Sequence, residues 1–254
     1  MNILIANDDG IKARGIQELV TAMSQVANVY VAAPHIQRSA TGHGITINDS
    51  MTMKPVEFKD AKGALEITGT PADCVKLGIG YFESKGIKID MVYAGINEGA
   101  NLGTDTLYSG TVSAAIEGNI LGKPAVAVSV CSHKPKHFEY ACMLAQKAFK
   151  EAALKLDSRT VLNINTPNKP AEEIKGVKYA RLGKRDYEGW FNPVKNHKGE
   201  LEVAYSGYPK EYNSDDLTID VIAFEQGYAT ITPLKYDLTN HYLIEEVESW
   251  GIDK

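Results

Sequence analysis

The chain has 254 residues, of which 44% are hydrophobic and 23% are charged. This length suffices for a substantial buried core and suits one domain with an appendage. No apolar run reaches the ~20 residues that a membrane-spanning helix needs, so we expect no membrane partner. A net charge of −5 argues against binding long nucleic acids through a basic surface, but permits a small phosphate ester whose charge a metal ion offsets.

The cysteines and the first residues indicate the cellular compartment of the protein. Cys74, Cys131 and Cys142 are widely spaced and lack the spacing of a metal site, which is typical of reduced thiols. The first predicted strand begins at residue 2, without the basic and small-residue segments of a signal peptide. We therefore expect a cytoplasmic protein.

The hydrophobic pattern predicts an α/β protein with a mostly parallel sheet. Residues 2–6 read as a strand, residues 15–23 as a helix with a regularly spaced apolar face, and residues 29–33 as a second strand. Such a unit places ligands outside the carboxyl ends of the strands. Later strands are expected at 51–57, 64–68, 89–95, 124–130, 160–165 and 228–233, the first two as a hairpin. Later helices are expected at 71–83, 110–121, 137–156 and 240–253.

One of these helices has a well-defined start. Thr70 is expected as the N-cap, Pro71 as the first helical residue, and Asp73 as the acidic partner of a capping box. Because capping explains Asp73 fully, we leave it out of the functional site.

The last third of the chain differs in character. From about residue 184 aromatic and charged residues mix, which predicts a protruding β arm. The aromatic residues are Tyr187, Trp190, Phe191, Tyr205, Tyr208 and Tyr212. We expect one domain over 1–254, with an α/β core at 1–183, the arm at 184–226, and a C-terminal strand and helix at 227–254.

An acidic pair, Asp8 and Asp9, directly follows the first predicted strand. Like charges this close repel, unless a cation lies between them or one group stays protonated. The alternative is that Asp9 caps the following helix while Asp8 is solvated. We interpret both as metal ligands, because two further polar loops should share this edge of the sheet.

The first of these loops follows the second strand and contains Ser39, and the second contains Asn97. Either side chain can be an ordinary turn residue. However, hydroxyl and amide oxygens can complete an Asp-Asp ligand set for a hard cation such as Mg²⁺, Mn²⁺ or Ca²⁺. A lone loop histidine, His43, is more typical of a surface position than of a ligand.

An anion site is predicted beside the metal. Asn101 precedes Ser109, Gly110 and Thr111, where a small-residue helix begins. A helix N-terminus offers free N–H groups and a positive dipole end, which suits phosphate. A metal beside a phosphate pocket indicates phosphoester hydrolysis, by an attacking water that Asp8 orients or deprotonates, or by direct attack of Asp8.

These motifs resemble the SurE (survival protein E) family of metal-dependent 5′-nucleotidases and acid phosphatases. The resemblance lies in segments 7–10, 33–39, 69–75, 95–103, 108–112, 162–167 and 232–234, which span nearly the whole chain in order. It implies a SurE-like three-layer sandwich with a Rossmann-like sheet. The arm matches the family poorly, and Ala40 stands where many members have Gly.

The resemblance also implies roles for individual residues. The divalent-metal ligands would be Asp8, Asp9, Ser39 and Asn97, with Asp8 and Asp9 catalytic. The phosphate-binding group would be Asn101, Ser109, Gly110 and Thr111. We expect these two groups to act separately, so that changes in the second leave metal affinity unaltered.

The expected reaction is hydrolysis of nucleoside 5′-monophosphates with one divalent cation per subunit, Mg²⁺ or Mn²⁺, and Ca²⁺ as another occupant. Further substrates would be 3′-nucleotides and polyphosphate, and the alternative is a broad-specificity phosphatase of the same fold acting on non-nucleotide esters. The resemblance further implies a homodimer that exchanges C-terminal segments, or a homotetramer formed by two such dimers.

Three other classes fit less well. A receiver domain needs an Asp after its third strand, where this chain has Gly95-Ile96-Asn97. A haloacid-dehalogenase-type phosphatase needs a nucleophilic Asp where Asn7 stands. A Rossmann dinucleotide-binding module needs Gly-x-Gly-x-x-Gly after the first strand, which is absent.

Overall fold

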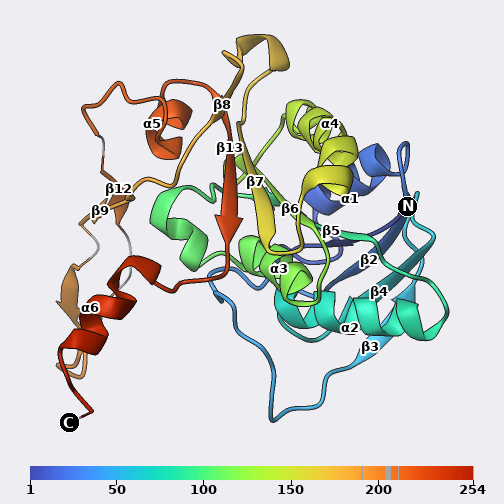
Figure 1. Ribbon diagram of the computed structural model, residues 1–254, viewed down its shortest axis with the longest axis horizontal. Coiled ribbons are helices and arrows are strands. Elements are labelled where there is room, and N and C mark those ends of the chain that lie inside the picture. Colours follow the sequence, from blue (N-terminus) through green and yellow to red (C-terminus); the bar gives the residue numbers. More distant parts are fainter. Residues whose placement is uncertain (190, 204–206, 211, 254) are drawn as a thin grey trace.

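The computed structural model describes residues 1–189, 191–203, 207–210 and 212–253, and Figure 1 shows how the elements are arranged. Within these residues one nine-stranded sheet has the order β3-β4-β2-β1-β5-β6-β7-β13-β8. Its strands are β1 (Asn2–Ala6), β2 (Asn28–Pro34), β3 (Met53–Val56), β4 (Gly63–Ile67), β5 (Met91–Glu98), β6 (Ala125–Cys131), β7 (Thr160–Pro167), β8 (Val177–Tyr179) and β13 (Ala229–Lys235).

The sheet is mostly parallel, as the hydrophobic pattern predicts. Strands β4, β2, β1, β5, β6 and β7 run parallel, whereas β3 pairs antiparallel with β4 and β13 pairs antiparallel with β7. The predicted hairpin is therefore confirmed as the β3–β4 pair. Short strand β8, which the sequence analysis missed, adds to β13 in parallel.

Helices cover both faces of the sheet (Figure 1). They are α1 (Arg14–Met23), α2 (Pro71–Ser84), α3 (Gly110–Ile120), α4 (Glu139–Lys155), α5 (Asp220–Glu225) and α6 (Ile244–Ser249), with 3₁₀ turns η1 (Gly103–Leu107), η2 (Ala171–Glu173) and η3 (His241–Leu243). The capping box of α2 is confirmed, since Thr70 and Asp73 exchange side-chain to backbone hydrogen bonds.

Two apolar clusters separate the three layers. Ile3 and Ile5 of β1 pack in the cluster of α1 and α4, while Leu4 and Ala6 pack in the cluster of α2 and α3. Successive side chains of a strand point to opposite faces, so the continuous apolar run of β1 reflects burial on both sides. This is typical of a central parallel strand.

The predicted arm is only partly β structure. Among its described residues, β10 (Pro193–Lys195) pairs with β11 (Leu201–Val203), and β9 (Tyr187–Glu188) pairs with β12 (Tyr208–Pro209). Two of its predicted aromatics, Trp190 and Tyr205, lie outside the described residues.

The end of the predicted arm belongs to the body of the molecule. Residues Asp220–Glu225 form α5, and Val221, Ile222 and Ala223 are buried there. A six-residue helix is too short to show a clear helical period in the sequence. The sequence therefore predicts an arm that continues to residue 226.

The C-terminal helix is shorter than the predicted 240–253. It consists of η3 and α6, and it extends away from the sheet in Figure 1. Its apolar side chains are exposed, with Tyr242 at 97% and Trp250 at 60% exposure.

Candidate active site

The topology brings three of the predicted loops together. From β1 the chain passes to β2 and β4 on one side of the sheet, and then returns to β5 on the other side of β1. The loops after β1, β2 and β5 therefore meet at a topological switch point, where open α/β sheets bind ligands. Asp8 and Ser39 lie in the first two of these loops, and Asn97 lies at the end of β5, where the third begins.

Asp8 is buried against the start of α3. Its side chain is 4% exposed, and its Oδ1 accepts a hydrogen bond from the Thr111 hydroxyl. Its main-chain oxygen accepts a hydrogen bond from the Arg38 N–H at 2.7 Å. Asp8 thus joins the loop after β1 to α3 and to the loop that carries Ser39.

Gly110, the first residue of α3, is required by this close approach. A Cβ at this position would lie 2.8 Å from the Asp8 Cβ and 2.9 Å from the Asp8 Oδ2. A side chain at position 110 would therefore collide with Asp8.

Asp9 connects the other two loops. Its Oδ1 accepts a hydrogen bond from the Gln37 amide nitrogen at 3.1 Å, and its Oδ2 accepts one from the Glu98 N–H at 2.9 Å. Gln37 precedes Ser39 by two residues and Glu98 follows Asn97 directly. The alternative in which Asp9 caps the next helix is not what the structure shows, because the N-cap of α1 is Ala13.

The two carboxyl groups are electrostatically unfavourable neighbours. Burial, and then the charge of Asp9, raise the pKa of Asp8 to about 6, although the hydrogen bond from Thr111 partly opposes this shift. Burial likewise raises the pKa of Asp9. Burial and the charge of Asp9 also raise the pKa of Glu98. This part of the site therefore disfavours additional negative charge and favours a cation.

The loop that carries Ser39 is fixed at points away from Ser39. Ser39 itself is exposed. Further along, His43 contacts Glu117 of α3 at 2.9 Å, and the Thr46 N–H and hydroxyl donate to Asp73. Asp73, set aside as a helix cap, therefore also fastens this loop, and His43 has a buried partner.

Asn97 lies at the end of β5, half-buried, beyond a shift of register between β5 and β6. Its amide nitrogen donates to the Gly99 carbonyl oxygen at 3.0 Å. This bond uses the nitrogen within the loop, so the amide oxygen is the atom that suits a hard cation.

The residues predicted to bind phosphate differ in the hydrogen bonds that they form. Ser109 is the N-cap of α3, and its Oγ accepts the Val112 N–H at 3.0 Å while its own proton stays available. Thr111 instead donates its hydroxyl proton to Asp8. Thr111 thus links the two groups of residues that the sequence analysis kept separate.

The donor set fits a hard divalent cation. Asp8 and Asp9 supply carboxylate oxygens, Ser39 a hydroxyl and Asn97 an amide oxygen, all of which such cations prefer. Among the described residues no group of three or more His, Cys, Asp or Glu side chains could hold a metal. Any site here therefore depends on neutral oxygen ligands beside the acidic pair.

The same order of loops occurs in known proteins. The family model described as Survival protein SurE matches residues 3–189. The 5′-nucleotidase SurE of Petrotoga mobilis is 42% identical over 251 residues, covering 98% of this chain and 99% of that protein. The chain belongs to the SurE family. The relative named 5′-nucleotidase SurE from Pelotomaculum thermopropionicum is also 42% identical, over 98% of this chain and 94% of that protein.

A solved SurE structure shares the whole fold. The crystal structure of the SurE protein from Aquifex aeolicus aligns with a TM-score of 0.84 at 36% identity, and covers 98% of this chain and 99% of that chain. The likeness extends beyond residue 189, so the SurE fold includes the hairpins and the C-terminal helix.

Some polar residues that hold the loops around this site in place were not predicted from the sequence. Asp220, at the start of α5, is fully buried and accepts hydrogen bonds from the N–H groups of Gly103 and Gly183 at 2.8 and 2.7 Å. Asp105 of η1 accepts the Tyr187 hydroxyl and lies 3.4 Å from the Arg185 guanidinium. The segment between Asn101 and Ser109 is therefore fastened to residues at the base of the arm.

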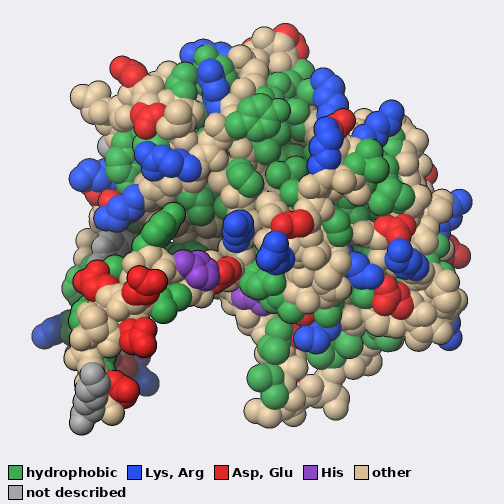
Figure 2. Space-filling view, in the orientation of Figure 1, with side chains coloured by type: hydrophobic (Ala, Val, Ile, Leu, Met, Phe, Trp, Pro, Cys, Tyr) green, Lys and Arg blue, Asp and Glu red, His purple; other side chains and the backbone are tan. Residues whose placement is uncertain are grey.

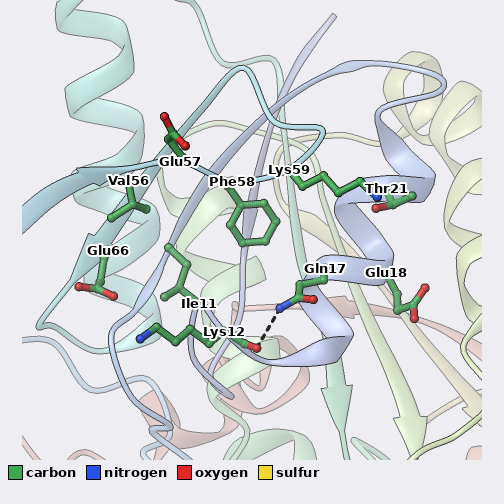
Figure 3. A pocket seen from close by; sticks show the side chains of 10 residues that line it. All are labelled: Ile11, Lys12, Gln17, Glu18, Thr21, Val56, Glu57, Phe58, Lys59 and Glu66. Carbon is green, nitrogen blue, oxygen red and sulfur yellow. Dashed lines mark hydrogen bonds between the residues drawn. The ribbon is translucent and has the colours of Figure 1, made fainter.

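Two cavities lie away from the acidic pair, since neither Asp8 nor Asp9 lines them. A cavity of about 600 Å³ lies between α1 and the β3–β4 hairpin. Figure 3 shows Ile11 and Phe58 facing it, with Lys12 and Lys59 among several carboxylates. This mixture of charges gives no preference for a phosphate ester. A larger, mostly apolar groove of about 980 Å³ lies between α3 and β13.

In the described part of the chain, no helix combines the length and the apolar character that crossing a membrane requires.

Proposed function

We propose that this protein is a 5′-nucleotidase that hydrolyses nucleoside 5′-monophosphates to nucleoside and phosphate with a divalent cation. Relatives named 5′-nucleotidase SurE match this chain over almost its entire length. The observation that carries the proposal is the position of Asp8. It is buried, with its pKa raised to about 6, and lies beside both Asp9 and the N-terminus of α3.

The cation would be held by Asp8, Asp9, Ser39 and Asn97, with Mg²⁺ or Mn²⁺ as the expected ion. When bound, it would supply positive charge for the phosphoryl oxygens and lower the pKa of a water. The raised pKa values of the two Asp side chains support this assignment, because a bound cation would stabilise the ionised forms that burial disfavours.

The phosphate would be held by donors on the other side of Asp8. Ser109 can donate its hydroxyl proton, because its oxygen already accepts from Val112. The Gly110 N–H lies at the positive end of α3, where anions bind favourably. Asn101 would supply an amide N–H. The hydroxyl of Thr111 would orient the Asp8 carboxylate, and its backbone would complete the cradle.

Asp8 is the group we assign to the attacking water. Its carboxylate would orient that water and take up its proton as the bond to phosphorus forms. The donors around the phosphate would stabilise the charge that develops on the phosphoryl oxygens.

The test is release of inorganic phosphate by the purified protein with Mg²⁺, Mn²⁺, Co²⁺ or Ca²⁺. The substrates would be 5′- and 3′-mononucleotides, polyphosphate and an aryl phosphate. We expect 5′-mononucleotides to be preferred, with 3′-nucleotides and polyphosphate as weaker substrates, and no turnover in excess chelator. An aryl phosphate cleaved as well as any nucleotide would instead indicate a broad-specificity phosphatase.

We also propose that one chain forms a single domain and that two chains form a homodimer by exchanging their C-terminal segments. The groove between α3 and β13 is lined by apolar residues including Leu107, Val112, Ile116 and Leu234. Figure 2 shows hydrophobic side chains beside the hollow that separates the C-terminal segment from the body. The segment itself exposes Leu238 at 84%. Burial of such surfaces in a second copy would stabilise both, and pairs of dimers would give the tetramer.

A further inference from the structure

Asn101 is fastened to the sheet through its own backbone. Its N–H donates to Asn165 Oδ1 at 2.8 Å, and its carbonyl oxygen accepts Asn165 Nδ2 at 3.0 Å and Asn163 Nδ2 at 2.8 Å. The carboxamide of Asn165 thus pairs with the backbone of Asn101 as a neighbouring strand would. Although Asn101 lies in a loop, its backbone is therefore fixed as firmly as that of a residue within the sheet.

The side chain of Asn101 is held as well. Its Nδ2 donates to Ser129 Oγ at 2.8 Å. Ser129 of β6 and Asn165 of β7 are neighbours in the parallel register of the sheet. Both the position of the residue and the plane of its carboxamide are therefore determined by two adjacent strands.

These strand residues are unusual for the interior of a parallel sheet. Ser129, Asn163 and Asn165 are fully buried, and Asn101 is 4% exposed. Burying polar groups is unfavourable unless they form hydrogen bonds. Within the described chain Asn163 Oδ1 has no partner, so the bond to Asn101 is the polar contact that explains this buried amide.

We propose that Ser129, Asn163 and Asn165 are positioning residues of the hydrolytic reaction and act through Asn101. This inference rests on the proposed function, in which Asn101 donates to the phosphate. Ser129 accepts one proton of the Asn101 amide and directs the second toward the phosphate. Asn163 and Asn165 fix the backbone, so no reorganisation is needed as charge develops in the transition state.

Ser129→Ala tests the proposal in two backgrounds, the otherwise unchanged protein and Asn101→Ala. The measurements are kcat and KM for adenosine 5′-monophosphate and the calorimetric Kd for inorganic phosphate, both with saturating Mn²⁺. In the unchanged background we expect kcat/KM to fall about 3- to 10-fold and phosphate to bind correspondingly more weakly. In the Asn101→Ala background both should change less than about 2-fold, because Ser129 then has no amide to direct.

Equal effects of Ser129→Ala in the two backgrounds would overturn the proposal, since a merely structural role does not depend on the Asn101 side chain. The control is Asn119→Ala at the far end of α3, which removes a partly buried 2.9 Å hydrogen bond to the Lys123 carbonyl oxygen. It should lower the free energy of unfolding and leave kcat unchanged. The phosphate titration separates the two hypotheses, because it reports on Asn101 even if nucleotides are not hydrolysed.

Asn165→Asp probes the backbone contacts. It retains the acceptor for the Asn101 N–H but places an anionic oxygen opposite the Asn101 carbonyl oxygen. We expect a larger loss than for Ser129→Ala, about 10- to 100-fold in kcat/KM. A folded Asn165→Asp variant with unchanged kcat and phosphate affinity would contradict the role assigned to Asn165.

Discussion

The loops at the switch point bury polar side chains, whereas the segment after β13 leaves apolar side chains exposed. At the switch point, polar groups are buried and bonded to one another, as in the Asp8–Thr111 and Asn101–Ser129 contacts. After β13, apolar groups are exposed, including Tyr242 at 97% and Ile252 at 79%. The first region therefore fixes polar side chains inside the protein, and the second leaves apolar side chains in contact with solvent.

The difference indicates which parts of the molecule one chain can complete. The hydrogen-bond partners of Asp8, Asp9 and Asn101 all lie before the C-terminal segment in the sequence, so we expect the chemistry not to need that segment. The C-terminal segment leaves apolar surface uncovered, and such surface usually marks an interface. Changes at the switch point should therefore alter turnover, whereas changes after β13 should alter assembly.

The largest effect is expected for Asp8→Asn. It removes the charge that would bind the cation and the base that would receive a proton, so phosphate release should fall by at least about 1,000-fold. The control is Asp60→Asn, because Asp60 has a φ of 63°, which Asn tolerates. Near-normal turnover of Asp8→Asn would remove Asp8 from the mechanism.

Gly110→Ala should be the next most damaging change. The new Cβ would lie 2.8 Å from the Asp8 Cβ, so either α3 or the acidic loop must shift. We expect kcat/KM to fall about 100-fold. Gly80→Ala is the matched control, since a Cβ there meets nothing within 4 Å, and it should raise the free energy of unfolding by up to about 1 kcal/mol.

Thr111→Val tests whether the metal and phosphate groups are separable. The variant keeps the shape of the side chain but removes the hydroxyl that donates to Asp8. We now expect metal affinity to fall several-fold together with a loss of about 10- to 100-fold in kcat/KM. Ser109→Ala should lower kcat/KM alone. Metal affinity would be measured by calorimetric titration. If it is unchanged in Thr111→Val, the metal-binding and phosphate-binding residues act separately, as the sequence predicted.

Ending the chain at Lys235 should alter assembly more than chemistry. Removal of η3 and α6 takes away the exposed apolar segment, so the mass measured by light scattering should drop to that of one chain. Turnover per chain should stay within about 3-fold, because the contacts of Asp8, Asp9 and Asn101 all lie before this point. An unchanged mass would exclude the C-terminal segment from the interface.

The last effect concerns the stability of the metal-free protein rather than its turnover or assembly. Because the pKa of Asp8 is raised to about 6 in the folded state, its ionisation above that pH destabilises the fold. This destabilisation should disappear as pH falls through 6 toward the ordinary value near 4 and amounts to about 3 kcal/mol at pH 7. Urea unfolding in chelator should show this dependence in the wild type relative to Asp8→Asn.

Much of the fold could be predicted because its signals are local. The apolar run of β1, the capping box at Thr70 and the helical period of α1 each reside in a few adjacent residues. The acidic pair was located by the same logic, because the end of a strand defines an edge of the sheet. Short α5 and β8 were missed because so few residues carry no detectable period.

The contacts within the site could not be predicted in this way. The Thr111 hydroxyl lies 103 residues from Asp8, and Asp220 lies 117 residues from Gly103. Sequence spacing does not determine the direction of side chains that meet only after folding. Asp73 shows the same limit, since capping explained it locally while its bond to Thr46 comes from a distant loop.

The bond between Gly183 and Asp220 has a consequence for how the chain can be engineered. The Arg181 N–H also donates to the Thr218 carbonyl oxygen at 2.8 Å, so the two ends of the intervening hairpins meet at the body of the molecule. The contacts that hold η1 come from Arg185, Tyr187 and Asp220, outside the β10–β11 hairpin. That hairpin can therefore be lengthened, shortened or exchanged for a foreign sequence while η1 keeps these contacts, which makes it a natural position for grafting.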